Sequence, residues 1–290
     1  MSGAIYALDK PVGVSSHQAM KTFQKSVGAR KAGHGGTLDP FATGVIIILS
    51  GSYTKLEPYL SHSHKVYQAS LELGCRTSTA DPEGEVVETA SVPPFDEVLL
   101  QQVATDLTGS VELPVPAYSA VKIAGRKAYD YARKGEILDM PVRTTSVANL
   151  VIKSDPSARR VHFYADVSRG TYIRALGEEI ARRLGTIGHL STLRRIRCCD
   201  IGVGDCVTLD QVRQNTPVPL SPCDVLRENT IFETDSHTIA ALHQGRPLQW
   251  NTLRETHAGL AGNPTGIVMD DSGAVVSVID IRQGRILRNI

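Results

Sequence analysis

The stretch Gly33–Ser50, GHGGTLDPFATGVIIILS, joins a glycine-rich loop to a short run of apolar residues. An apolar run of the length of Gly44–Leu49 is typical of a strand buried in the centre of a sheet. In the loop, glycines let the backbone approach a ligand closely, and Pro40 stiffens the turn after Asp39. Asp39 is either a turn residue that bonds its own backbone or a catalytic carboxylate at the edge of a sheet.

The residues before this loop predict a strand, a turn and a helix. The strand covers Ala4–Leu8 and the turn covers Lys10–Gly13. Ser15 is expected to cap the helix, because Gln18 stands three positions further on, as in a capping box.

Two later segments, Val66–Leu73 and Val161–Val167, alternate between apolar and polar residues. This alternation predicts half-buried strands and turns Tyr67 inward. A helix follows, and its buried stripe comprises Ile173, Leu176, Ile180 and Leu184. Arg174 lies at the border of this stripe, where a long side chain can bury its stem and aim its head inward. The alternative is a surface pair with Glu178.

The last part of the chain is predicted to be a separate small domain. A proline-containing stretch, Pro217–Pro222, is expected to end a first domain of residues 1–228. Residues 229–290 predict a helix near Ser236–Gln244 and a hairpin of strands at Gly266–Met269 and Ala274–Ile281. The expected fold is α+β: a mixed, mostly antiparallel sheet with flanking helices and a central catalytic cleft, followed by the small β-rich domain.

Composition bounds the class of protein. With 290 residues, the chain is long enough for one large and one small domain. Its N-terminus lacks the pattern of a secretory signal, and no run approaches the roughly 18 apolar residues of a membrane span. We therefore expect a cytoplasmic protein with no membrane partner, and the lack of extensive apolar runs favours a monomer.

Cysteine and histidine usage argues against a metal site. The five cysteines include no CxxC pair and are odd in number, which fits neither a disulfide framework nor a zinc knuckle. His62 and His64 form an HxH pair, but no Cys, Asp or Glu cluster with ligand spacing accompanies it. We expect no metal.

The middle of the chain is basic, although the net charge is only +1. Residues 121–200 hold 16 of the 31 Lys and Arg residues but only 8 of the 30 Asp and Glu residues. Within residues 116–144, cationic side chains are interleaved with tyrosines. Such a pattern suits contact with the phosphates and bases of a nucleic acid. A solvated basic surface is the alternative.

Several segments together resemble the bacterial TruB-type tRNA pseudouridine synthases. The match spans most of residues 4–200 and follows the order of the family. Its segments are LDKPVGVSS at Leu8–Ser16, GHGGTLDPFATGV at Gly33–Val45, KVYQASLELG at Lys65–Gly74, YSAVKIAGRKAYDYAR at Tyr118–Arg133, SRGTYIRAL at Ser168–Leu176 and LRR at Leu193–Arg195. Residues 229–290 resemble the RNA-binding PUA domain of these enzymes.

The resemblance implies an isomerase that converts the T-loop uridine of tRNA, at position 55, to pseudouridine. The glycosidic bond breaks, the base rotates, and it reattaches through carbon without a cofactor. Asp39 then corresponds to the essential carboxylate, acting as nucleophile or base. Whether it attacks the base or the sugar stays open.

The resemblance also implies three residues around Asp39. Arg174 corresponds to the guanidinium that keeps the carboxylate charged and oriented. Tyr67 corresponds to the aromatic ring on which the flipped-out base stacks, and Tyr172 to a second wall of the pocket. An ordinary core tyrosine is the alternative for Tyr67.

Further residues correspond to RNA contacts of the family. His34 is expected to support the flipped-out nucleotides, and Lys10 belongs to a Lys-Pro motif that is more structural than chemical. Asp81 receives only a supporting role in its loop. An RNA-gripping insertion at about residues 116–144 is expected to order on binding. Its contact residues are Lys122, Arg126, Lys127 and Arg133.

Other functions remain to be weighed. A synthase acting on another RNA, such as ribosomal RNA, usually has a different local motif around its Asp. A non-catalytic RNA-binding or tRNA-folding factor has no need of Asp39, Tyr67 and Arg174 together. A nucleoside hydrolase is expected to carry an Asp-rich calcium motif, which the sequence lacks.

Overall fold

The computed structural model describes residues 3–60, 64–119, 121–123, 125–132, 134–136, 138–155, 159–244 and 246–290. The chain divides into two compact units, Met1–Ser63 with Arg197–Ile290 and, between them in sequence, His64–Ile196. This division does not test the domain boundary expected after residue 228, which stays a prediction.

Three antiparallel strands begin the first unit: β1 (Ala4–Lys10), β2 (Ala32–Gly35) and β3 (Thr43–Ser50). Strand β1 pairs with β3 along its whole length, and β2 also pairs with β3. Seven of the eight residues of β3 are buried, which confirms the buried strand predicted from the apolar run. Burial on both faces explains why its residues do not alternate.

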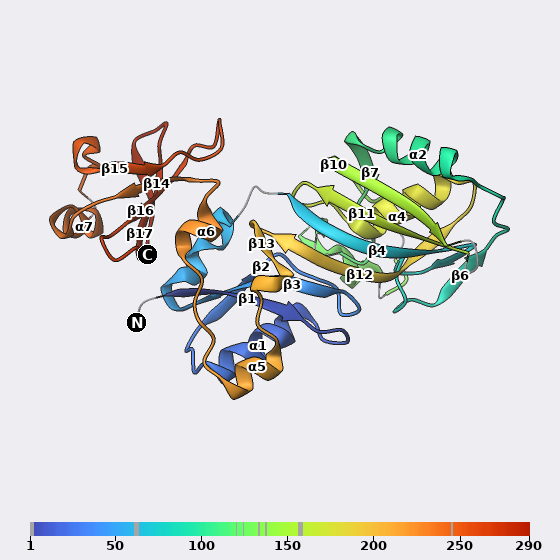
Figure 1. Cartoon of the computed structure of the whole chain (residues 1–290), viewed down its shortest axis with the longest axis horizontal. Helices are drawn as coiled ribbons and strands as arrows, with labels where there is room; N and C mark the ends of the chain where they lie inside the picture. The colour runs from blue at the N-terminus through green and yellow to red at the C-terminus, as the bar shows by residue number, and fades with distance from the viewer. Residues whose placement is uncertain are drawn as a thin grey trace. The chain divides into compact units, whose positions relative to one another are not determined.

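Two helices pack on these strands: α1 (Ser16–Ser26) and α5 (Leu209–Gln214). Figure 1 shows them side by side. Ser15 and Gln18 form the predicted capping box. The apolar cluster that joins helices to strands includes Leu8, Met20, Phe23, Ile46, Ile48 and Val212.

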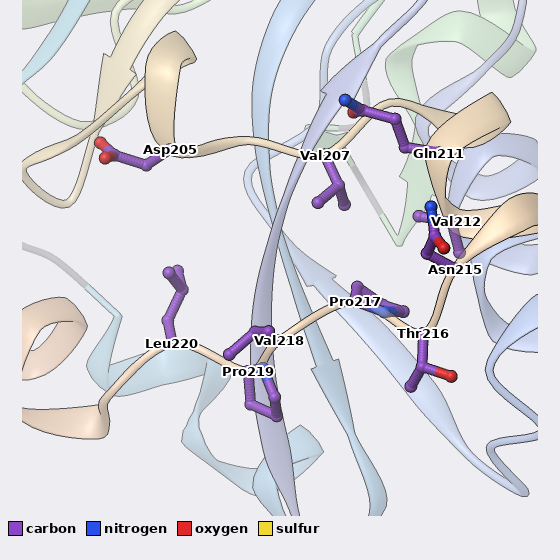
Figure 2. Close-up of a pocket in the computed structure, with 10 residues that line it drawn as sticks. All are labelled: Asp205, Val207, Gln211, Val212, Asn215, Thr216, Pro217, Val218, Pro219 and Leu220. Atoms are coloured by element: carbon purple, nitrogen blue, oxygen red, sulfur yellow. The ribbon is translucent and has the colours of Figure 1, made fainter.

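An extended strap, Asn215–Leu220, follows α5. Its last residue returns to β1, where the amide of Leu220 donates to the carbonyl of Ile5 at 2.8 Å. The strap lines a hollow of about 470 Å³ together with Asp205, Val207 and residues of α5, and Figure 2 shows these lining residues. Asp205 is the one charged side chain of this lining.

The C-terminal part of the first unit is a five-stranded sheet in the order β15-β14-β16-β17-β18. Strand β14 runs parallel to β16, and the other neighbours are antiparallel. The strands are β14 (Thr230–Glu233), β15 (Arg254–His257), β16 (Thr265–Met269), β17 (Val275–Asp280) and β18 (Arg285–Asn289). The accompanying short elements are β13 (Ile201–Gly202), η3 (Val203–Asp205), α6 (Pro222–Leu226), α7 (Ser236–His243) and η4 (Trp250–Thr252). The predicted helix and C-terminal hairpin are confirmed by α7 and by β16 with β17.

The C-terminal sheet shares its core with the N-terminal strands. One cluster of buried residues contains Ile47 and Leu49 of β3 together with Ile267 of β16 and Val278 of β17. The segment η1 (Gly51–Tyr59) joins the two parts. These parts are therefore one folding body, in which apolar burial couples the two ends of the chain.

Hydrogen bonds reinforce this junction. The amide of Val275 donates to the phenol oxygen of Tyr53 at 2.8 Å. Asn229, which is 1% exposed, donates through Nδ2 to the carbonyl of Tyr59 at 3.2 Å.

The second unit is built on five strands in the order β12-β4-β11-β10-β7. They are β4 (Lys65–Leu73), β7 (Gly109–Pro114), β10 (Val142–Asp155), β11 (Arg160–Val167) and β12 (Gly188–Cys198). The helices are α2 (Glu97–Asp106), α3 (Ala128–Ala132) and α4 (Ile173–Arg183), and two small hairpins are β5 (Cys75–Thr77) with β6 (Val86–Thr89) and β8 (Lys122–Ile123) with β9 (Arg126–Lys127). Figure 1 shows α2 beside β10.

The alternation predicted for this unit is confirmed in β4 and β11. Residues Val161, Phe163, Ala165 and Val167 are buried, whereas His162 between them is exposed. Strand β4 pairs antiparallel with β11, which places Tyr67 opposite Ala165 on the buried side. No helix within the described part of the chain is long and apolar enough to cross a membrane.

Replacing Tyr53 by Phe tests the junction between the two ends of the chain. The variant leaves the buried amide of Val275 without its acceptor, so the free energy of unfolding should fall by about 1–3 kcal/mol in urea titrations at pH 8. Tyr59→Phe, at a half-buried ring, is the matched control and should change little. Equal losses in both variants would contradict the assignment.

Comparison of wild type with Tyr53→Phe should also reveal a pH dependence of stability. Burial raises the pKa of the Tyr53 phenol above its ordinary value of 10.0. A group with a raised folded pKa contributes stability below its unfolded pKa and loses it as the pH rises through the folded value. As the pH rises above 10, the free energy of unfolding of wild type should therefore fall more than that of Tyr53→Phe.

Candidate functional site

Asp39 lies in the tight loop between β2 and β3 of the first unit. Its carbonyl accepts a hydrogen bond from the amide of Ala42 at 3.1 Å, which closes a turn around Pro40 and Phe41. Asp39 is half-buried, whereas Leu38 and Phe41 on either side are buried. The apolar neighbours anchor the loop, and the carboxylate is carried on a defined backbone.

Lys10 fixes the loop on the C-terminal side of Asp39. Its side chain is fully buried, and its ammonium donates to the carbonyls of Pro11 at 2.9 Å, Val14 at 2.7 Å and Pro40 at 3.2 Å. A buried charge needs several such partners, because it has lost its water. Lys10 thus supports the Asp39 loop, and its expected place among the substrate-binding residues stays a prediction.

Ser16 fixes the loop on the N-terminal side of Asp39. Its hydroxyl lies 2.8 Å from the carbonyl oxygen of Leu38 and 2.8 Å from the amide nitrogen of Leu38. Ser16 is 2% exposed. The segment Leu8–Ser16 therefore braces both sides of Asp39 through buried polar contacts.

Arg174 is a buried cation of the second unit. It lies in the first turn of α4 and is 5% exposed. Its guanidinium donates to the carbonyl of Thr79 at 2.9 Å and to the carbonyl of Tyr118 at 2.9 Å. The inward orientation considered from the sequence is thus the observed one.

Asp81 is the carboxylate that accompanies Arg174. Its Oδ2 lies 3.5 Å from Nη1 of Arg174, and both side chains are at most 5% exposed. Its Oδ1 accepts from the amide of Glu83 at 3.0 Å and from the hydroxyl of Thr79. From the sequence we expected only a supporting role for Asp81 in its loop; its partner Arg174 stands 93 positions further along the chain.

A second carboxyl group lies near this pair. Burial raises the pKa of Glu178, one turn after Arg174 in α4, and the charges of Arg76 and Arg174 partly oppose this effect. Glu178 is thus a further carboxyl group close to Arg174 and Arg76.

The two tyrosines expected at the site lie in different elements. Tyr67 is 7% exposed in β4 and faces the buried side, as predicted. Tyr172 is half-buried and is the N-cap residue of α4, directly after the turn at Ser168–Thr171. Their roles toward a substrate stay predictions.

His34 occupies the middle of β2, opposite Ile48 of β3, and is half-buried. It lies on the strand that leads into the Asp39 loop. Its expected contact with flipped-out nucleotides also stays a prediction.

The insertion carries exposed cations next to aromatic rings. Lys122, Arg126 and Lys127 are exposed on the β8–β9 hairpin. The guanidinium of Arg126 stacks 4.2 Å from the ring centre of Tyr131, and Lys127 Nζ lies 5.5 Å from that of Tyr129. Cation–π contacts hold these heads in place at the surface. Arg133, also expected to contact RNA, lies outside the described residues.

The described residues contain no group of three or more His, Cys, Asp and Glu side chains that could hold a metal. His64 bonds Asp166 across 3.0 Å, whereas His62 lies outside the part of the chain that the structure describes.

Comparisons with known proteins converge on one family. The model of the TruB family pseudouridylate synthase N-terminal domain matches residues 24–173. A tRNA pseudouridine synthase B of Gluconacetobacter diazotrophicus is 37% identical over 238 residues, which cover 82% of this chain and 77% of that protein. A tRNA pseudouridine synthase B of Streptococcus gordonii is 38% identical over 276 residues, covering 90% and 92%.

The fold also occurs in a solved structure. A chain of a Cbf5-Nop10-Gar1 complex superposes with a TM-score of 0.72 at 24% identity, covering 95% of this chain and 77% of that chain. This likeness supports the mixed α+β architecture with mostly antiparallel strands.

Ser16→Ala tests how firmly the Asp39 loop is braced. The variant leaves the buried backbone of Leu38 without the hydroxyl, so we expect a loss of about 1–3 kcal/mol in stability and faster hydrogen exchange at the Leu38 amide. Ser26→Ala, in the same helix but exposed, is the control. Unchanged exchange at Leu38 would show that the brace does not order the loop.

Proposed function

The chain belongs to the TruB family of pseudouridylate synthases, and from this premise we propose that it isomerises the T-loop uridine of tRNA, at position 55. The observation that carries the proposal is the Asp39 loop. It presents a single carboxylate on a backbone fixed from both sides by Lys10 and Ser16. One positioned carboxylate is what an isomerisation without a cofactor requires.

The reaction rearranges one nucleotide without net loss of atoms. The bond between N1 of uracil and C1′ of ribose breaks, the base rotates, and a bond forms between C5 and C1′. The proton on C5 is released to a base, and N1 takes up a proton. In the proposed mechanism Asp39 acts as nucleophile or base at this centre.

Arg174 is proposed as a second catalytic residue. Its support is the fixed geometry of the head, which two backbone carbonyls and Asp81 hold within the second unit. Because a guanidinium donates several hydrogen bonds in one plane, part of it can be held by the protein while the rest serves the reaction.

The flipped-out uracil is proposed to stack on Tyr67, with Tyr172 as a second wall. Both rings are attached to regular secondary structure, β4 and the start of α4, so little conformational entropy is lost in positioning them for a substrate. Stacking compensates the base for the contacts it loses inside the RNA loop. His34 is proposed to support the neighbouring nucleotides.

The insertion is proposed to grip the T-arm of tRNA. Lys122, Arg126 and Lys127 present exposed positive charge beside tyrosine rings, which suits both phosphates and unstacked bases. Arg133 completes this set in the proposal. Residues 229–290 are proposed as a PUA-like RNA-binding module of a protein that works as a monomer in the cytoplasm.

The first experiment measures tritium release from an unmodified tRNA transcript labelled at C5 of uridine, with EDTA present. Wild type should release tritium, and Asp39→Asn should release at least about a thousandfold less while keeping its stability. Asp210→Asn, at an exposed carboxylate of the same unit, should match wild type.

Transcripts with cytidine at position 55 separate the substrate from the chemistry. Release from these transcripts at the wild-type rate would assign another uridine or another RNA. Tight tRNA binding without any release from either transcript would instead favour a non-catalytic RNA-folding factor.

The RNA grip is tested by Arg126→Ala combined with Lys127→Ala. Removing two phosphate contacts should weaken tRNA binding and reduce the slope of log K against log salt by roughly 1.4 to 1.8. Arg213→Ala, at an exposed cation of α5, is the control. Parallel salt plots for the double variant and wild type would remove the insertion from the RNA-binding surface.

A further inference from the structure

Ser119 buries a hydroxyl that the protein itself does not use. The residue lies at the base of the insertion and is 5% exposed. Its amide donates to the carbonyl of Ala117 at 3.0 Å, and its carbonyl accepts from the amide of Tyr129 at 3.1 Å. Its Oγ has no hydrogen-bond partner within the described residues, which omit Ala120.

The other buried serines behave differently. Among the residues that the structure describes, Ser16, Ser50 and Ser277 are the remaining buried serines, and the hydroxyl of each is hydrogen-bonded. A buried hydroxyl without a partner destabilises the folded state, because it has given up water and gained nothing. Such a group therefore calls for a reason.

The position of Ser119 supplies that reason. The amide nitrogen of Ser119 is bonded to the carbonyl carbon of Tyr118, and the oxygen of that carbonyl accepts from Nη2 of Arg174. Ser119 is thus the chain neighbour of the residue whose carbonyl the guanidinium holds, and the proposed function places that guanidinium at the reacting nucleotide. The backbone contacts of Ser119 with Ala117 and Tyr129 fix its location at the point where the insertion leaves the body of the second unit.

We propose that Ser119 contacts the substrate, its hydroxyl donating a hydrogen bond to an acceptor oxygen of the target nucleotide once the RNA is bound. This inference rests on the proposed function. A donor reserved for the ligand lowers stability in the free protein and is satisfied only in the complex, as expected where a site trades stability for activity. It also ties the RNA-gripping insertion to the chemical centre, since one residue belongs to both.

Ser119→Ala distinguishes a substrate contact from a structural one. Removal of an unsatisfied group should leave the melting temperature of the free protein within about 1 °C of wild type or raise it. Tritium release at saturating tRNA should nevertheless fall by roughly ten- to hundredfold, the range for one hydrogen bond to a substrate. Ser119→Cys, which keeps a weak donor of similar size, should recover part of the rate.

Ser277→Ala calibrates the thermal measurement. Its hydroxyl is buried and bonded to Asn289, so its removal should lower the melting temperature. A similar fall for Ser119→Ala would show a protein partner for that hydroxyl and overturn the proposal. Wild-type turnover by Ser119→Ala would overturn it as well.

The same assay separates this inference from the function on which it rests. No tritium release by wild type overturns both. Release by wild type with full activity in Ser119→Ala overturns only the role of Ser119.

Discussion

The buried ammonium of Lys10 is the interaction on which the site in the first unit depends. It collects the carbonyls of the turn after β1 and of Pro40, so the strand and the Asp39 loop cannot move independently. Transfer of this charge from water is costly and is offset only by good geometry with several oxygen partners. The position of the Asp39 carboxylate therefore depends on the attraction between the Lys10 ammonium and backbone carbonyls.

The second unit uses the same physical solution with a different cation. Arg174 holds the carbonyls of Thr79 and Tyr118 and pairs with Asp81. These three partners come from two chain segments that precede α4. In each unit a buried cation thus holds the backbone of a loop in place. The proposed catalytic Asp39 and the proposed RNA-gripping insertion are attached to these loops.

Much of the fold could be predicted, because local patterns in the sequence indicate several of its strands and helices. The apolar run of β3, the capping box of α1 and the alternation of β11 are each visible within a dozen residues. Strand β10 was not predicted, because the bulge between Val147 and Asn149 shifts its register and breaks the period of two. The pairing of Asp81 with Arg174 was also missed, since no local pattern reports a contact between distant segments.

The proposed catalytic role of Asp39 rests on several motifs in a fixed order, not on the chemistry of one Asp-Pro turn. Taken alone, the turn fits an ordinary structural aspartate, and the observed bond from Ala42 to its carbonyl is compatible with both readings. What the structure adds is the bracing of that turn by Lys10 and Ser16.

The core shared by β3, β16 and β17 has a consequence for synthesis on the ribosome. Ile47 and Leu49 emerge early, but the strands that cover them end near Val278. At about 5–20 residues per second, roughly 10 to 45 s pass before those partners are made. During that interval β3 can pack only against early residues of the same cluster, such as Ile5, Tyr53 and Leu56, and its apolar core stays incomplete until β16 and β17 are made.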